Sequence, residues 1–166
     1  MRVMGLDFGS RTCGVAMSDE LLMTAQPVET IHRDRPSKIR KTLARIEELI
    51  ETHNVGLIVL GLPLNMNDTQ GERAAATLEF RDQLTRRTGL PVVMSDERLT
   101  TVEADGLLDE MGIAPADRKT YLDTVAANII LQEYMENHRV IIYKDGEKRV
   151  YRDADDGEEA DEQIEI

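Results

Sequence analysis

The first part of the chain alternates short apolar runs with glycine-containing turns, a pattern typical of β-strands. Residues 2–8 and 12–18 form two such runs, and the turn Gly9-Ser10 between them is short enough for a hairpin. A third run follows at residues 27–31. We therefore expect three strands in an antiparallel meander.

Helical spacing then takes over and alternates with two buried strands. Apolar residues recur every three or four positions between Ser37, the expected N-cap, and His53. Residues 56–60 and 91–95 are dominated by apolar side chains, as in strands that are covered on both faces. Further helices are expected over residues 71–87, from 100 or 101 to 111, and over 118–137. The order β-β-β-α-β-α-β-α-α predicts an α/β fold with a mixed five-stranded sheet and helices on both faces.

The sequence after residue 138 has a different character. Two short β-type runs flank Asp145-Gly146, which is the strongest short-range signal for a hairpin. Residues 152–166 hold eight acidic residues and one arginine, so residues 1–151 carry only −5 of the net charge of −12. A segment with so few apolar residues cannot bury enough surface to fold. We therefore divide the chain into a domain over 1–138, a β-hairpin appendage over 139–152 and a disordered acidic tail over 153–166.

The acidic balance argues at first sight against nucleic acid as a partner, because phosphate binding favours a basic surface. The hairpin carries four basic residues, which either contact nucleic acid or belong to a plain surface ribbon: Lys144, Lys148, Arg149 and Arg152. The tail either only solvates the protein or screens a basic groove by mimicking nucleic acid. The charge therefore leaves the partner open.

Composition excludes several classes of protein. The single cysteine, Cys13, cannot form an internal disulfide and is expected to pack as a small apolar residue in a reducing compartment. The three histidines are scattered and have no cysteine partners, which argues against a zinc site. A carboxylate appears at position 7, too early for a signal peptide, and no apolar run approaches the ~20 residues of a membrane span. We expect a cytoplasmic protein with no membrane partner.

Three carboxylates stand where a sheet could bring them together. Asp7 ends the first apolar run, Glu97 follows the run 91–95, and Asp123 lies in the last helix. Burying such charges is costly unless they meet a cation, so the three predict a site for Mg²⁺ or Mn²⁺. Each has an alternative: a turn cap for Asp7, the neighbouring Asp96 as the ligand in place of Glu97, and the helix dipole for Asp123.

Other polar residues near these acids are candidates for holding a substrate. Arg11, Arg98 and Lys119 are expected to neutralise a phosphodiester group and to stabilise its transition state. Thr100 adds a hydroxyl beside Arg98, and Asn65 lies in the polar loop 61–74. That loop either faces the substrate and leads into a helix N-terminus, or merely connects two elements.

Four segments together resemble the YqgF/RuvX family in that family's order and spacing: residues 7–16, 61–66, 96–104 and 119–132. The first segment alone would also suit the phosphate loop of sugar kinases and Hsp70-type ATPases. The resemblance implies an RNase H-like fold related to the Holliday junction resolvase RuvC, in a family assigned to maturing the 5′ end of pre-16S rRNA. It also implies that the catalytic acids are Asp7, Glu97 and Asp123.

The hypothesis that follows is a metal-dependent nuclease in which these three acids hold two Mg²⁺ ions and cleave structured RNA by in-line displacement. Its expected partner is precursor rRNA in a ribosomal context, bound by a monomer or a homodimer. Three alternatives stay open: a Holliday junction resolvase acting on four-way DNA, a non-catalytic rRNA-binding assembly factor, and an ATP-binding module.

Overall fold

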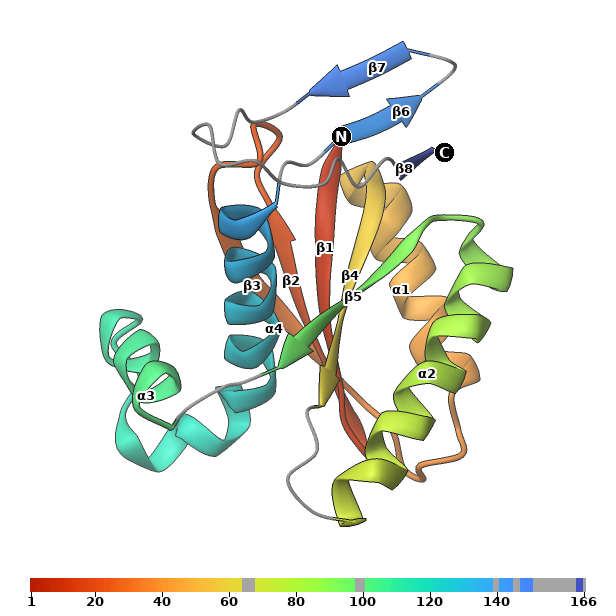
Figure 1. Cartoon of the computed structure of the whole chain (residues 1–166). Coiled ribbons are helices and arrows are strands. Elements are labelled where there is room, and N and C mark those ends of the chain that lie inside the picture. The colour runs from red at the N-terminus through yellow and green to blue at the C-terminus, as the bar shows by residue number, and fades with distance from the viewer. Residues whose placement is uncertain (64–67, 98–100, 139–140, 145–146, 151–163, 166) are drawn as a thin grey trace.

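The computed structural model describes residues 1–63, 68–97, 101–138, 141–144, 147–150 and 164–165, with the side chains of 63, 68–70, 96–97, 101–105, 119–120 and all residues after 138 left out (Figure 1). Eight strands, four α-helices and one short 3₁₀ helix lie within these residues. In chain order they are β1 (Arg2–Phe8), β2 (Thr12–Ser18), β3 (Ala25–His32), α1 (Arg40–His53), β4 (Val55–Pro63), α2 (Asp68–Thr88), β5 (Val92–Glu97), α3 (Thr101–Glu110), η1 (Pro115–Asp117), α4 (Arg118–Asn137), β6 (Ile141–Lys144), β7 (Glu147–Val150) and β8 (Ile164–Glu165).

The predicted order of elements is confirmed, and one helix start was wrong. We expected Ser37 to cap the helix that ends at His53, but α1 begins at Arg40 and its N-cap is Ile39, which has no side-chain capping bond. The reason is local. The carbonyl of Ser37 accepts a hydrogen bond from the N–H of Ile39, so Ser37 belongs to a turn that precedes the helix.

Strands β1 to β5 form the mixed five-stranded sheet that the sequence predicted, in the order β3-β2-β1-β4-β5. β1 pairs antiparallel with β2 and parallel with β4, and β4 pairs parallel with β5. Because β1, β4 and β5 run in the same direction, their carboxyl ends lie at one rim of the sheet. Ligands bind preferentially at such a rim in α/β proteins.

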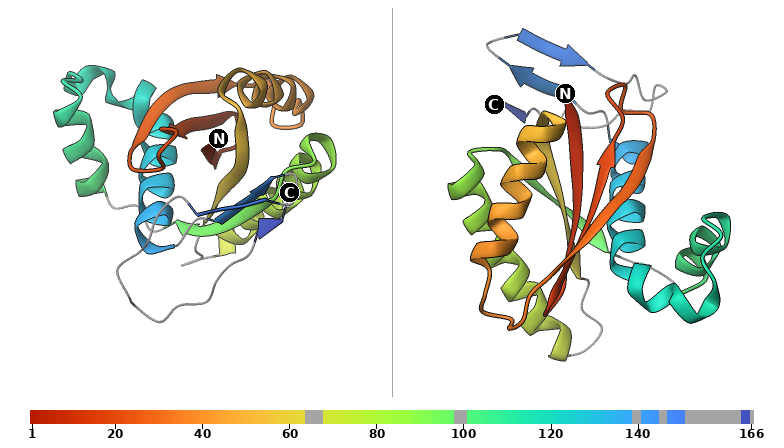
Figure 2. Two further views of the ribbon diagram at one scale, coloured as in Figure 1. Left: turned by 90° about the horizontal axis from the view of Figure 1, so that it is seen from above. Right: turned by 180° about the vertical axis from the view of Figure 1, so that it is seen from behind.

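Alternating residues of β1 build a different core on each face of the sheet. Met4, Leu6 and Phe8 pack with buried residues of α1 and α2. Val3 packs instead with buried residues of α4, and Gly5 lies directly against that helix. Figure 2 shows α1 and α2 on one side of the sheet and α4 on the other. The sheet is therefore covered on both faces, as predicted.

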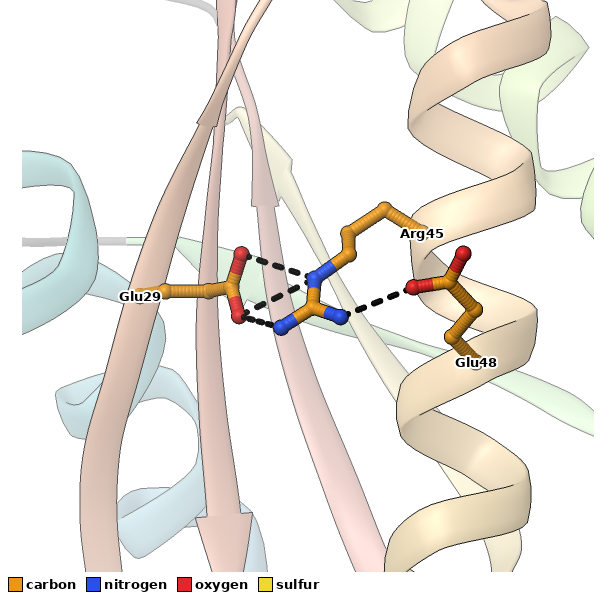
Figure 3. Close-up of polar contacts among 3 residues, drawn as sticks. All are labelled: Glu29, Arg45 and Glu48. Carbon is orange, nitrogen blue, oxygen red and sulfur yellow. Dashed lines mark hydrogen bonds and ion pairs between the residues drawn. The ribbon is translucent and has the colours of Figure 1, made fainter.

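The edge strand β3 is tied to α1 by an ion-pair group around Arg45 (Figure 3). Its Nη2 donates to Glu29 of β3 at 2.7 Å and its Nη1 donates to Glu48 of α1 at 2.8 Å. These hydrogen bonds, chiefly the one to Glu29, raise the pKa of Arg45. β3 also contains Pro27, and its pairing with β2 shifts in register between Val15 and Ala16.

A separate small sheet contains the predicted hairpin. β6 and β7 pair antiparallel, with Lys144 opposite Glu147 on either side of the expected turn. β8 pairs parallel with β6, so residues 164–165 differ from the disorder expected of the tail. The remaining tail residues lie outside those described, and the division into three parts stays a prediction. None of the helices within the described residues is long and apolar enough to span a membrane.

Candidate active site

The carboxylate of Asp7 is buried at the rim of the sheet, in the next-to-last position of β1. Asp7 is only 7% exposed to solvent. Gly14 of β2 is its direct cross-strand partner. Directly opposite residues of an antiparallel pair share one face of the sheet, so Asp7 and Gly14 both lie on the face that α4 covers. Asp7 therefore stands beside a glycine at the contact between the sheet and a helix.

Gly14 allows α4 to lie directly on the backbone of β2. A Cβ atom added to Gly14 would fall 1.9 Å from the carbonyl oxygen of Asp123 and 2.4 Å from its carbonyl carbon. Any side chain there would collide with helix backbone and force the helix to move, so this close approach requires glycine. Since Gly14 lies opposite Asp7, this contact brings the segment of α4 that carries Asp123 to the corner of the sheet that contains Asp7.

Two further contacts fix how α4 lies on the sheet. A Cβ atom at Gly5 would fall 2.7 Å from the Cβ of Leu131, so the middle of α4 also lies against bare backbone. Near the start of the helix, the hydroxyl of Thr124 contacts the hydroxyl of Thr30 on β3. Together these contacts set the position and the rotation of α4 where it carries Asp123. Asp123 itself is half-buried.

A buried arginine fixes the turn that follows Asp7. Nη2 of Arg33 donates to the carbonyl oxygens of Gly9 at 2.6 Å and Ser10 at 2.7 Å. The backbone N–H of Arg33 donates to the carbonyl of Arg11 at 2.7 Å. Burial lowers the pKa of Arg33. The sequence alone does not identify Arg33 as a functional residue, because a single arginine after a strand has no pattern that distinguishes it from a surface cation.

The pKa of the Cys13 thiol responds to the charges of Asp7 and Asp123. Cys13 lies in β2 between Thr12 and Gly14, and its side chain is buried in the core on the α1 and α2 face. Burial raises the pKa of its thiol most strongly, and the negative charges of Asp7 and Asp123 raise it further, while Arg33 lowers it. The thiol is therefore held in its neutral form, which agrees with its predicted packing as a small apolar residue.

Several predicted site residues are described only in part. Glu97 is the last residue of β5 and pairs with Pro63 of β4, and its side chain lies outside the description. Lys119 is in the first turn of α4, also without a described side chain. Arg11 is exposed directly after the turn at the end of β1. Asn65, Arg98 and Thr100 lie outside the described residues.

The side chains described contain no group of three or more His, Cys, Asp or Glu residues close enough to hold a metal ion. The side chain of Glu97 is not among those described, so this absence concerns only two of the three predicted acids. Asp7 and Asp123 are brought to one face of the sheet, and convergence of the full set stays a prediction.

Comparison with known proteins gives a consistent result. Residues 1–137 match the family model described as RuvX: Holliday junction resolvase. A protein of Agathobacter rectalis named "Putative pre-16S rRNA nuclease" is 59% identical over 136 residues, which cover 82% of this chain and 95% of that protein. One of Lachnospira eligens with the same name is 56% identical over 137 residues, covering 82% and 98%.

The fold has a counterpart among solved structures. The RuvC structure of Thermus thermophilus matches with a TM-score of 0.53 at 13% identity, over 81% of this chain and 94% of that one. At this identity the likeness concerns the fold alone, and it confirms the predicted RNase H-like architecture. The family model that matches residues 1–137 and the two relatives at 59% and 56% identity show that the chain belongs to the RuvX family of nucleases.

Proposed function

We propose that this protein is a metal-dependent nuclease whose catalytic acids are Asp7, Glu97 and Asp123, and that it acts on precursor 16S rRNA. The observation that carries the proposal is the contact at Gly14. Through it, a buried carboxylate of β1 and the carboxylate-bearing turn of α4 share one corner of the sheet. Burial of the Asp7 carboxylate beside a second, half-buried acid is costly unless a cation compensates it.

The residues at this corner fit a divalent metal ion. Two nearby carboxylates repel each other, and burial of Asp7 strengthens that repulsion, so a cation would stabilise both. An all-oxygen set of ligands is the set that Mg²⁺ and Mn²⁺ prefer. Asp7, Glu97 and Asp123 would hold the ions. When bound, such ions lower the pKa of water and stabilise the charge of the leaving oxygen.

The register of β5 supports Glu97 as the third ligand. Val93 belongs to the core on the α4 face, and Met94 contacts the core on the opposite face. Strand residues alternate between faces, so positions 93, 95 and 97 form one series and position 96 belongs to the other. This alternation favours Glu97 over Asp96, the choice that the sequence left open.

Substrate binding is proposed for basic and polar residues around the same rim. Arg11 is exposed next to a turn whose carbonyl groups accept hydrogen bonds from Arg33. The backbone that carries the Arg11 side chain is therefore held in place. A guanidinium suits a phosphodiester because it can donate two parallel hydrogen bonds. The other proposed contacts come from Asn65, Arg98, Thr100 and Lys119.

The relatives of Agathobacter rectalis and Lachnospira eligens are named as nucleases of pre-16S rRNA, which supports precursor 16S rRNA as the substrate. A second candidate is resolution of four-way DNA junctions, which the description of the matching family favours. A dimer would suit junction resolution, because two strands must be cut, whereas a monomer can trim RNA. The two substrates should therefore be compared with the same preparation.

The test replaces single acids in the full-length protein. Asp7→Asn should abolish Mg²⁺-dependent cleavage of precursor 16S rRNA and leave the thermal unfolding transition in place, and Asp123→Asn should do the same. Asp82→Asn is the matched control, because Asp82 is an exposed acid on α2 that pairs only with Arg81 among the described residues. Normal cleavage by Asp7→Asn would refute the assignment. Cleavage of four-way DNA but not of RNA would select the second candidate.

A further inference from the structure

A cavity of about 540 Å³ lies beside the β1–β2 turn, on the sheet face opposite α4. It is bounded by that turn, by the connection between β3 and α1, and by residues 72–83 of α2. Apolar parts of its wall come from Phe8, Pro36, Ile39 and Ala76. A volume of several hundred Å³ with apolar walls and a few polar groups is typical of sites for small ligands. The nuclease site proposed above does not use this cavity.

The cavity adjoins a stack of flat side chains. The rings of Phe80 and Phe8 lie 4.0 Å apart between centroids and 7° from parallel. The guanidinium carbon of Arg33 lies over the Phe8 ring, 4.6 Å from its centroid. Since Phe80 covers one face of this ring, Arg33 covers the other. Arg33 also lines the cavity, so the stack ends at the cavity wall with a flat cation.

The positive charge of Arg33 is removed from water without full compensation. It is only 6% exposed, and its Nε and Nη1 have no hydrogen-bond partner among the residues that the structure describes. No described carboxylate forms an ion pair with it. Both nitrogens are enclosed by the protein, so a ligand would meet the cation through its flat face, and a π system stacked there would recover part of the cost of removing the charge from water.

The charges of the wall point to a neutral ligand. Two arginines, Arg33 and Arg73, are matched by two glutamates, Glu72 and Glu79. The glutamates would repel a phosphate but can accept hydrogen bonds from the amino groups of a nucleobase, and Arg73 can donate to its carbonyl oxygens and ring nitrogens. Bases of single-stranded nucleic acid stack readily on arginine guanidinium groups.

We infer that this cavity holds one unpaired nucleobase of the substrate strand, next to the phosphodiester group that is cleaved. The inference rests on the proposed function and deepens it. Asp7 and Phe8 are consecutive residues of β1, so the acid faces one side of the rim while the stack that leads to the cavity faces the other. A strand bound across this rim would need a single-stranded nucleotide there. Fully paired substrates would fit poorly.

The test measures base stacking without cleavage. Full-length Asp7→Asn protein in EDTA is titrated into a single-stranded oligoribonucleotide that carries 2-aminopurine, whose fluorescence falls when the base stacks. We expect a saturable fall in fluorescence. The same oligonucleotide paired to its complement should give at least a ~10-fold weaker response, the order of magnitude that one stacked base contributes to binding.

Two variants in that background locate the site. Ala76→Tyr fills the cavity and should weaken binding by about 10-fold, the contribution of one stacked base. Ala75→Tyr is the matched control, because Ala75 is the exposed neighbour on α2 that does not line the cavity. Arg33→Met should also weaken binding, and a thermal unfolding curve checks that this variant folds. Equal binding by the two tyrosine variants, or by paired and single-stranded probes, would overturn the inference.

Failure of the nucleobase inference can be distinguished from failure of the nuclease assignment. If otherwise unmodified Asp7→Asn cleaves RNA normally, the proposed catalytic site fails. If Asp7→Asn is inactive but Ala76→Tyr binds the single-stranded probe as tightly as Ala75→Tyr, the catalytic site stands and the nucleobase site fails.

Discussion

The contact between Gly14 and Asp123 leads to a prediction for Gly14→Ala. The new Cβ atom would lie 1.9 Å from the carbonyl oxygen of Asp123, 2.4 Å from its carbonyl carbon and 3.0 Å from the backbone nitrogen of Thr124. All three are backbone atoms of α4, so no side chain can rotate out of the way. To restore the 3.4 Å at which ordinary contact begins, the helix must retreat by about 1.5 Å.

This retreat should affect both stability and catalysis. Overpacking of a well-packed interior costs about 1–3 kcal/mol, so the free energy of unfolding should fall by that amount. Displacement of a catalytic group by about 1 Å can slow a reaction about 100-fold, and Gly14→Ala moves the backbone of Asp123 itself. We therefore expect cleavage of precursor 16S rRNA to be roughly 100-fold slower, measured at a temperature where the variant is fully folded.

Two other glycines serve as controls. Gly106→Ala in α3 meets no atom within 4 Å, and in a helix interior alanine is more favourable than glycine by about 1 kcal/mol, so this variant should be as active as wild type and no less stable. Gly5→Ala pushes against the middle of α4, 2.7 Å from the Cβ of Leu131, and should lose stability with a smaller loss of rate. A Gly14→Ala protein with unchanged cleavage rate and unfolding free energy would refute the reasoning.

Three further predictions concern the body of the fold. Burial raises the pKa of the Cys13 thiol, so above the unfolded pKa of about 8.5 only the unfolded chain loses the thiol proton. The free energy of unfolding of the wild type should therefore fall as the pH rises, and that of Cys13→Ala should fall less. Urea titrations at several pH values measure this difference. Phe80→Ala should lower the free energy of unfolding by about 3–5 kcal/mol, because Phe80 is fully buried, whereas Leu78→Ala on the exposed side of α2 should change it far less; equal urea midpoints would contradict this. Arg45→Gln should lower the melting temperature slightly at low salt and not at 1 M NaCl, since a partly exposed ion pair is screened; a salt-independent loss would argue for a packing role instead.

The elements that the sequence predicted well are those in which one physical signal dominates. β1, β2 and α4 have the predicted bounds, because continuous apolar runs or regular helical spacing leave little choice of secondary structure. The start of α1 was wrong because a serine before a helix can cap it or form a preceding turn, and only the backbone path decides between these. Such a choice depends on tertiary packing that local pattern does not contain.

The candidate site was predictable to a similar degree. The positions of Asp7 and Asp123 followed from apolar runs and helical spacing, and the structure brings both to one face. The role of Gly14 was not foreseen, because a glycine in a strand can serve a bulge, a turn or a close approach, and the contact spans more than 100 residues of sequence. Arg33 was missed for the related reason that its partners are backbone carbonyls, which every residue has.

The make-up of β3 limits how two copies of this protein can associate. An unprotected edge strand invites another chain to extend the sheet, but Pro27 lacks the N–H that such an extension needs, and the register shift beside it disturbs the regular spacing of backbone groups. The charged pair of Glu29 and Arg45 would have to lose water as well. Any homodimer should therefore form through a surface other than the β3 edge. Pairing of β3 strands between two copies would then not restrict access to the rim that carries Asp7.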